Sequence, residues 1–223
     1  MTPGPEPTAS SAARRRAVVI AGHARDEVTA RAGLDDPSPE VRGSALTALA
    51  RMGSLQAHDL TRALVDATGE VRRRAGELAG RHGQGSFEDQ LVAALSDGLP
   101  SVVEAACSAL GELDAGEPRT GAVAALSRVA TGHRDPLCRE AAVAALGALG
   151  HPQGLAPVLS ALADKAAVRR RAVIALAGFD DAFGGEDVQA ALRKALRDPD
   201  WQVRQGAEDV LGPRTRPGPA QPA

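Results

Sequence analysis

Histidine and cysteine are the residues of this sequence whose chemistry could hold a metal ion or make a nucleophile. Repeated His-Glu pairs would supply iron ligands, but the five histidines are followed by Ala, Asp, Gly, Arg and Pro; they are His23, His58, His82, His133 and His151. Cys107 and Cys138 lack the CxxC spacing of a zinc or redox site. The sequence therefore predicts no metal site, and we expect both cysteines to lie in the core.

An acidic segment between residues 178 and 187 is a second group with chemical potential. It contains Asp180, Asp181, Glu186 and Asp187, which invites a calcium interpretation. The segment lacks the alternating acids and the terminal bidentate Glu of a calcium-binding loop. We expect a solvated turn in which the two nearby phenylalanines, at positions 179 and 183, point inward.

Motifs that carry catalysis are absent from the sequence. It has no Gly-rich phosphate loop, no nucleophile elbow and no pair of cysteines with metal-ligand spacing. We therefore predict no catalytic residues and no cofactor, and we expect the chain not to be an enzyme.

The composition indicates what kind of scaffold positions these residues. Hydrophobic residues make up 43% of the chain, and they are mostly Ala, Leu and Val; the aromatic residues are three Phe and one Trp. Such a composition favours helices over strands, so an all-α fold is expected. A net charge of −2 argues against a surface that is basic throughout, as a dedicated nucleic-acid binder would show.

Near the N-terminus a basic triplet, residues 14–16, precedes apolar residues, an order that is typical of an export signal. The apolar run, Ala17 to Ala21, is shorter than the roughly 7 to 15 residues of a signal peptide. No segment approaches the roughly 18 apolar residues of a membrane span. We expect a cytoplasmic protein that does not enter a membrane.

One pattern returns seven times along the chain. Aligned segments start at Ala13, Val41, Val71, Val102, Cys138, Val168 and Val203. Four residues after every start comes an alanine, and eight residues after it comes Leu or Ala. Positions 0, +4 and +8 lie on one stripe of a helix, so each segment predicts an amphipathic first helix.

Second helices are expected between these segments, because the same period recurs there. They include residues 58–66, 88–97, 157–164 and 188–198. Each unit is then a helical hairpin, and about seven stacked hairpins predict an α-solenoid over residues 13–212. The polar Glu208 at a core position predicts a cap that completes the solenoid. Residues 1–12 and the Pro-rich residues 213–223 lack a core pattern, and disorder is expected for both tails.

The repeated order of Asp, Val-Arg, Ala and Leu-Gly across about thirty residues resembles the HEAT repeat. In particular, it is similar to the short repeats of phycobilisome-lyase-like proteins. The resemblance implies a superhelix in which Asp and Arg side chains bond from unit to unit as a structural ladder. Its members in this sequence would be Asp36, Arg42, Asp66, Arg72, Arg139, Asp164, Arg169, Asp198 and Arg204. Arg14 also stands at the ladder's Arg position, and Val103 interrupts the pattern in the fourth unit.

A ladder needs one arginine per unit, so the remaining cations are candidates for binding a partner. Arg73 and Arg170 occupy position +2, which faces solvent on the first helices. Arg62, Arg193, Lys194 and Arg197 belong to the second helices, which line the inner surface of a HEAT stack. Trp201 stands in the last turn between units and is either a packing residue of the end or an anchor for a partner.

These observations favour a non-catalytic scaffold or adaptor that binds another protein as a monomer. Two alternatives stay open. One is a nucleic-acid-binding HEAT protein that uses the arginine clusters at residues 72–74 and 169–171. The other is a lyase-like or accessory enzyme subunit, which the repeat type alone suggests.

Overall fold

The structure, a computed structural model, describes residues 10–82, 87–113, 120–179 and 185–212. Backbone contacts divide the chain into two compact units, residues 1–109 and 110–223. Residues 1–9 and 213–223 of the predicted tails and residues 180–184 of the acidic segment lie outside the described residues.

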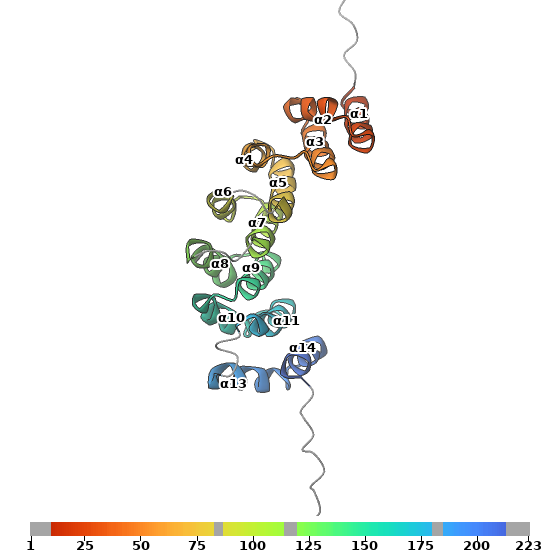
Figure 1. Cartoon of the computed structure of the whole chain (residues 1–223). Coiled ribbons are helices and arrows are strands. Elements are labelled where there is room, and N and C mark those ends of the chain that lie inside the picture. The colour runs from red at the N-terminus through yellow and green to blue at the C-terminus, as the bar shows by residue number, and fades with distance from the viewer. Residues whose placement is uncertain (1–9, 83–86, 114–119, 180–184, 213–223) are drawn as a thin grey trace, which may run out of the picture. The chain divides into compact units, whose positions relative to one another are not determined.

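Each unit consists of paired helices (Figure 1), and the described residues contain no strand. The first unit contains α1 (Ser11–Ala24), α2 (Glu27–Ala32), α3 (Pro39–Met52), α4 (Ala57–Leu64), α5 (Gly69–His82), α6 (Glu88–Ala94) and most of α7 (Pro100–Glu112). The second contains α8 (Thr120–Gly132), α9 (Pro136–Leu149), α10 (Leu155–Ala161), α11 (Ala166–Ala175), α13 (Glu186–Ala195) and α14 (Trp201–Leu211). Short 3-10 turns complete them: η1 (Gly33–Asp35), η2 (Pro152–Gly154) and η3 (Leu176–Gly178). The all-α solenoid of helical hairpins is confirmed.

Every first helix begins two residues before the start read from the repeat. The helices α1, α3, α5, α7, α9, α11 and α14 start at Ser11, Pro39, Gly69, Pro100, Pro136, Ala166 and Trp201. The aligned position is the first residue that faces the core, whereas the helix needs an earlier turn to reach it. Three of these helices begin with Pro, which fits the first helical position because that N–H has no partner there.

The start of α1 differs from the predicted domain boundary at residue 13. Ser10 caps the helix, and its hydroxyl accepts a hydrogen bond from the amide of Ala13 at 3.2 Å. A serine at this position satisfies one of the free N–H groups of the first turn. Residues 11 and 12 are therefore helical rather than part of a tail.

The second helices are shorter than the repeat pattern suggested. They end at Leu64, Ala94, Ala161 and Ala195, before the aspartates at 66, 97, 164 and 198. Those aspartates lie in the turn, where their carboxylates bond backbone N–H groups instead of continuing the helix. The aspartates thus stand at the junction between one hairpin and the next.

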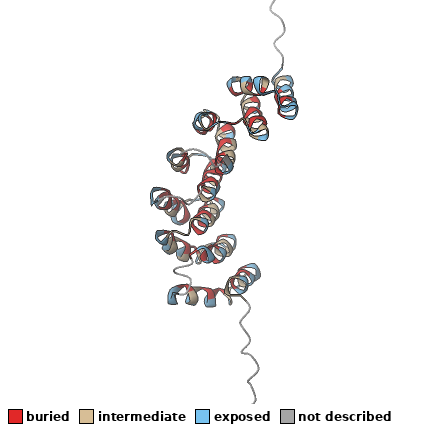
Figure 2. Ribbon diagram, in the orientation of Figure 1, coloured by how far each residue is buried: buried red, intermediate tan, exposed pale blue. Residues whose placement is uncertain are grey.

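The core runs along the inner faces of the hairpins (Figure 2). In the second repeat and in every later one, the first core position is fully buried. These residues are Val41, Val71, Val102, Cys138, Val168 and Val203. The second helices from α4 onward add fully buried large residues, such as Leu60, Leu91, Val158 and Leu192. Burying a side chain of this size contributes roughly 1.5–3 kcal/mol, so the repeated column is the main source of stability. Ala17, at the +4 position of α1, is exposed.

Neighbouring first helices approach closely where small residues face each other. In α9, a Cβ added to Gly147 would stand 2.6 Å from the Cβ and 2.7 Å from the Cα of Ala175 in α11. A Cβ added to Gly22 of α1 would likewise stand 2.8 Å from the Cβ of Ala48 in α3. Because the neighbours are backbone and Cβ atoms, they cannot swing aside, so only glycine permits this spacing.

We expect Gly147→Ala to destabilise the protein by about 1–3 kcal/mol, because the extra methyl group overpacks the α9–α11 contact. Gly43 provides the matched control, since a Cβ there meets nothing within 4 Å. Gly43→Ala should stabilise α3 by about 0.5–1 kcal/mol through helix propensity. Urea unfolding of both variants measures the difference, and equal effects would contradict the close-contact explanation.

Candidate functional site

The most regular feature of the structure is a set of bidentate Arg–Asp pairs, each of which we call a rung. In every rung, an arginine on a first helix bonds an aspartate in the turn that follows the same hairpin. The Nε and Nη2 atoms of the arginine donate to the two carboxylate oxygens of the aspartate. The N···O distances lie between 2.6 and 3.0 Å. The five pairs are Arg14–Asp36, Arg42–Asp66, Arg72–Asp97, Arg139–Asp164 and Arg169–Asp198.

Each rung also ties the backbone of the turns together. The third nitrogen of Arg72, Nη1, donates to the carbonyl oxygens of Asp66 and Ala67 at 2.7 and 3.1 Å. Asp97 in turn accepts the amide N–H of Leu99 at 3.0 Å. The arginines at 42, 139 and 169 repeat the carbonyl contacts. A rung therefore satisfies carbonyl and amide groups that the helix ends leave free.

The rungs hold their aspartates in the charged form. The guanidinium of Arg72 lowers the pKa of Asp97 below its ordinary value, and Arg169 does the same to the pKa of Asp198. At Asp66, burial raises the pKa, but the bonds from Arg42 and from the Thr68 amide outweigh it, so the pKa is again lowered. These carboxylates are unsuited to act as general acids near neutral pH.

Two members of the sequence pattern depart from this geometry. Arg204 donates to the carbonyl oxygens of Asp198 and Pro199 at 2.7 and 3.1 Å, but it makes no ion pair with a described carboxylate. Arg204 thus makes the bonds of a rung to the turn before its own helix. It makes none to a later turn, because no such turn follows α14 among the described residues. Val103 takes the arginine position on α7 and is fully buried.

A further ion pair, between two neighbouring hairpins of the first unit, was not recognised from the sequence. Arg31 of α2 contacts the carboxylate of Asp59 in α4 at 3.0 Å and the carbonyl oxygen of Ser54 at 2.8 Å. Asp59 is buried, and it also caps its own helix by accepting the amide of Gln56. The capping-box spacing of Gln56 and Asp59 was the signal that could have placed this aspartate. Arg31 is held in place by these contacts.

The residues with metal or nucleophile chemistry do not form a site in the described part of the chain. No group of three or more His, Cys, Asp or Glu residues there could hold a metal ion. The thiols of Cys107 and Cys138 are buried in the core. His133 and His151 accept backbone amides two residues ahead, and His58 contacts Asp59 at 3.1 Å. These histidines serve turns and helix ends.

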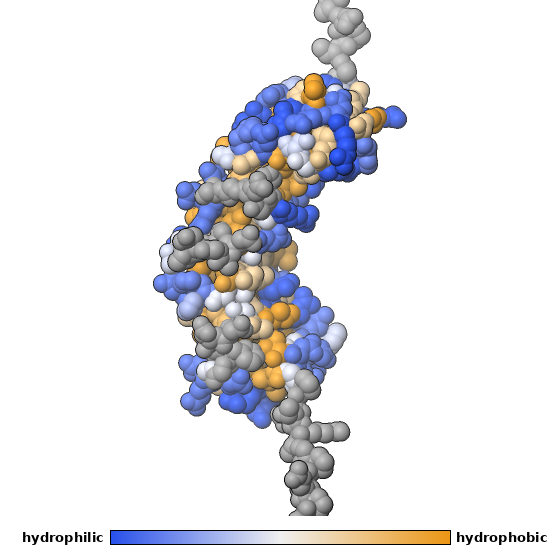
Figure 3. All heavy atoms as spheres, in the orientation of Figure 1, coloured by the Kyte–Doolittle hydropathy of each residue, from blue (hydrophilic) through white to orange (hydrophobic). Residues whose placement is uncertain are grey.

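A groove in the second unit is lined by three of the cations that were predicted from the sequence to bind a partner. It has a volume of about 780 Å³ and lies against α10, α13 and the turn into α14. Arg193, Lys194 and Arg197 line it, together with the Arg169–Asp198 rung. Its remaining lining is apolar: Leu159, Leu162, Ala163, Ala190, Ala191, Ala195, Pro199 and Val203. On the face of the molecule that Figure 3 displays, hydrophobic residues lie beside hydrophilic ones.

Arg193 and Lys194 lie in the last turn of α13, and Arg197 lies in the turn that follows it. Ala190, Arg193, Lys194 and Arg197 follow the spacing of three and four residues that defines a helical stripe, while Val188 and Leu192 of the same helix are buried. The three cations are exposed and form no ion pair with any residue that the structure describes. Their charge is therefore available to a ligand.

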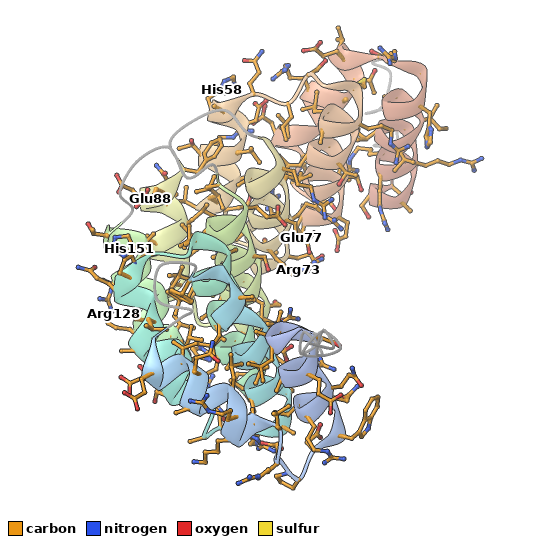
Figure 4. The ribbon with its side chains drawn as sticks, turned by 60° about the horizontal axis from the view of Figure 1, so that its bottom comes forward. His58, Arg73, Glu77, Glu88, Arg128 and His151 are labelled. Atoms are coloured by element: carbon orange, nitrogen blue, oxygen red, sulfur yellow. The ribbon has the colours of Figure 1, made fainter. Side chains whose placement is uncertain are left out.

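The other candidate residues are placed differently. Arg73 and Glu77 lie side by side on α5 (Figure 4), and Arg73 also pairs with Glu70 at 2.5 Å. Arg62 pairs with Asp35 at 2.9 Å and remains 58% exposed. Arg62 and Arg73 belong to the first unit and Arg170 to the second.

Arg170 lies 3.9 Å from Glu140 and donates to Gln202 at 3.3 Å. Trp201 is 64% exposed at the start of α14, two residues after Pro199 of the groove. Its exposure argues against the packing interpretation of this residue. Of the seven candidates, only the three on and beside α13 share a groove.

Together, paired helices, a repeated core column and inter-unit rungs define the class of α-solenoid repeat proteins. The sequence model of the HEAT-repeat family matches residues 89–177 and 159–221. The chain belongs to the HEAT-repeat family. No curated protein matches the sequence, and no described helix is long and apolar enough to cross a membrane.

Solved structures with a similar fold include engineered and designed proteins. An engineered protein of the Northeast Structural Genomics Consortium has a TM-score of 0.62 at 19% identity, over 83% of this chain and 95% of its own. A designed armadillo repeat protein has a TM-score of 0.59 at 22% identity, over 83% and 97% of the two chains. Another, in complex with the peptide (KR)4, has a TM-score of 0.59 at 20% identity and the same coverage. At these identities the likeness concerns the fold alone.

The rungs predict different costs for two adjacent arginines of α11. We expect Arg169→Gln to lower the unfolding free energy by about 1–3 kcal/mol, because it removes charge-assisted bonds to Asp198 and to the turn. Arg170→Gln should cost less than about 0.5 kcal/mol, since exposed ion pairs contribute little. Urea unfolding at neutral pH tests this. Equal losses of unfolding free energy in the two variants would show that the rung contributes no more than an exposed ion pair.

The lowered pKa values also predict how stability depends on pH. Since the folded state holds these aspartates below the unfolded pKa of roughly 3.9, their contribution is full above that value and is lost as pH falls through the folded pKa. We expect the unfolding free energy to decrease mainly below about pH 4.

Asp97→Asn provides the control for this pH dependence. The variant should be less stable than wild type at pH 7 and should lose less on acidification, because one of the low-pKa carboxylates is gone. Chemical unfolding in a pH series measures both quantities. Parallel pH profiles of the variant and the wild type would contradict the assignment.

Proposed function

We propose that this HEAT-repeat chain is a non-catalytic adaptor that binds another protein through the groove of α10 and α13. The observation that carries the proposal is the stripe of three exposed, unpaired cations beside an apolar floor. Protein-binding surfaces combine apolar contact with a few charged anchors, among which arginine is favoured. The same proposal includes a monomeric state and a cytoplasmic location.

A purely structural explanation of the three cations is their position at the C-terminal end of α13. Cations there interact favourably with the helix dipole. That effect needs no groove, however, and it does not explain why Leu159 and Leu162 remain partly exposed next to the charges. An adaptor site accounts for both the charges and the apolar floor.

The nucleic-acid alternative relied on the arginine clusters at residues 72–74 and 169–171. Arg72 and Arg169 are in rungs, and Arg73 and Arg74 pair with glutamates of α5. Residues 110–223 carry fourteen basic and fourteen acidic side chains, a net charge of zero. No aromatic residue is among those lining the groove, so stacking of bases has no platform there.

The test is an affinity capture from extract of the source cells after nuclease treatment, followed by titration of the purified captured protein. Wild type is compared with the double variant Arg193→Glu, Arg197→Glu. The matched control is Arg128→Glu, Arg134→Glu, which changes the charge equally at exposed positions of the same unit. We expect the captured protein to bind wild type and control alike and to bind the groove variant at least about tenfold more weakly.

Two results would overturn the proposal. The first is a protein that binds all three chains equally, which would remove the groove from recognition. The second is recovery that disappears after nuclease treatment, which would favour the nucleic-acid alternative. A coloured or metal-containing preparation of the chain would point instead to the lyase-like alternative.

A further inference from the structure

We propose that the groove of α10 and α13 receives an acidic segment of its protein partner, in which an apolar side chain lies between carboxylates. This inference rests on the proposed function and names the chemistry of the partner. The groove supplies four cations and one carboxylate, and that carboxylate, Asp198, is already held by both N–H groups of Arg169. The uncompensated charge of the lining is therefore that of Arg193, Lys194 and Arg197.

The sequence of α13 leaves these charges without local compensation. The positions three and four residues before Arg193 and Lys194 are occupied by Gln189, Ala190 and Ala191. The acids of this helix, Glu186 and Asp187, stand in its first turn, which is about 10 Å along the axis from Arg193. Arg73 on α5 shows the opposite arrangement, with Glu70 and Glu77 at neighbouring positions of its own helix.

The spacing of the cations sets the spacing of the anions they would bind. Arg193 lies in the last turn of α13, and Arg197 lies in the tight turn that continues from it, where its amide donates to the carbonyl of Lys194. On a helix, residues four apart have Cβ atoms about 6 Å from each other. Carboxylates four residues apart on a partner helix have the same separation. Arginine binds a carboxylate with two parallel N–H groups, so each guanidinium can orient one acid.

The floor of the groove requires more than charge. Leu159, Leu162 and Ala163 come from the α10 side, and Ala190 and Ala191 from α13. The alanines are short, so they leave room between the two helices, and the two leucines offer partly exposed apolar surface. An apolar side chain that fills this space gains about 25 cal/mol per Å² of buried area. A purely acidic chain would leave the floor in contact with water.

Charge also argues against the chain's own C-terminal segment as the occupant. The eleven residues after Gly212 contain two arginines and no acid. Bringing them to the three groove cations would place like charges together. Nucleic acid would complement the charge but would not use the apolar floor, and no aromatic residue lines the groove for its bases.

The inference is tested with the full chain and a fluorescein-labelled peptide of roughly twelve residues, about three helical turns. The peptide carries pairs of Glu four residues apart with Leu between them. Companion peptides replace each Glu by Gln or by Lys, and a labelled single-stranded DNA of similar length is the fourth probe. Fluorescence anisotropy at low and at physiological salt measures binding to wild type and to variants.

We expect the acidic peptide to bind wild type at least about tenfold more tightly than it binds Arg193→Glu, Arg197→Glu. The milder double variant Arg193→Gln, Arg197→Gln should lie between them, and thermal melting checks that every variant folds. Arg128→Glu, Arg134→Glu should keep wild-type affinity. The Gln and Lys peptides should bind wild type more weakly than the Glu peptide.

Several results would overturn the inference. These are no binding of the acidic peptide to wild type, equal binding of the Gln or Lys peptide, and equal loss in the control variant. If the captured protein still depends on the groove cations while the acidic peptide fails, the adaptor function stands and only the partner chemistry is wrong. If DNA alone binds and depends on the groove, both proposals fail.

Discussion

The guanidinium group of the rung arginine is the constraint on which the rest of the structure depends. In the Arg72 rung, two of its nitrogens bond the carboxylate of Asp97, and the third bonds the carbonyls of the turn before its own helix. One planar group therefore fixes the shape of one turn and the position of the next. Lysine could not replace it, because an ammonium group cannot meet a carboxylate and two carbonyls with this fixed geometry. The same requirement explains why the aspartate lies outside the second helix.

Small residues determine how closely the first helices of neighbouring hairpins approach each other. Gly147 against Ala175 and Gly22 against Ala48 let first helices approach until backbone atoms nearly touch. At that distance the arginine of one unit can reach the aspartate of the next. Larger residues are buried in the columns between the two helix layers, at positions such as Leu60 and Leu192. The first helices are thus held by close contact on one side and by charge in the turns.

Much of this architecture could be predicted because it repeats. The first core position, the alanine four residues later and the Arg and Asp columns were readable from seven aligned segments, and the α-solenoid followed. The repeat alignment locates the first core position of each first helix, whereas the helix itself begins two residues earlier. The Arg31–Asp59 pair was missed because it occurs once and has no column.

The candidate site was less accessible to sequence analysis. Arg73 and Arg193 look alike as exposed helical arginines, and they differ in what surrounds them. Glutamates pair with Arg73, whereas Arg193 faces an apolar floor formed by another hairpin. Composition and period do not determine which helix supplies that floor. The grouping of Arg193, Lys194 and Arg197 with Leu159 and Leu162 required the packing of α10 beside α13.

The rung also bears on how such a chain can grow. Each rung arginine bonds the turn before its own helix and the turn after its own hairpin, so a duplicated hairpin would bring its own arginine and its own aspartate. Its arginine would meet the aspartate of the new turn, and the pair on either side would keep its partner. Extra residues in the loop between the two helices of a hairpin also leave its rung intact, because Arg14 and Asp36 are 22 residues apart and Arg169 and Asp198 are 29 apart, yet both pairs form. The offset from the turn carbonyl to its arginine, by contrast, is only five or six residues. The ladder therefore accommodates whole hairpins and longer loops within a hairpin, but not residues inserted between a turn and its arginine.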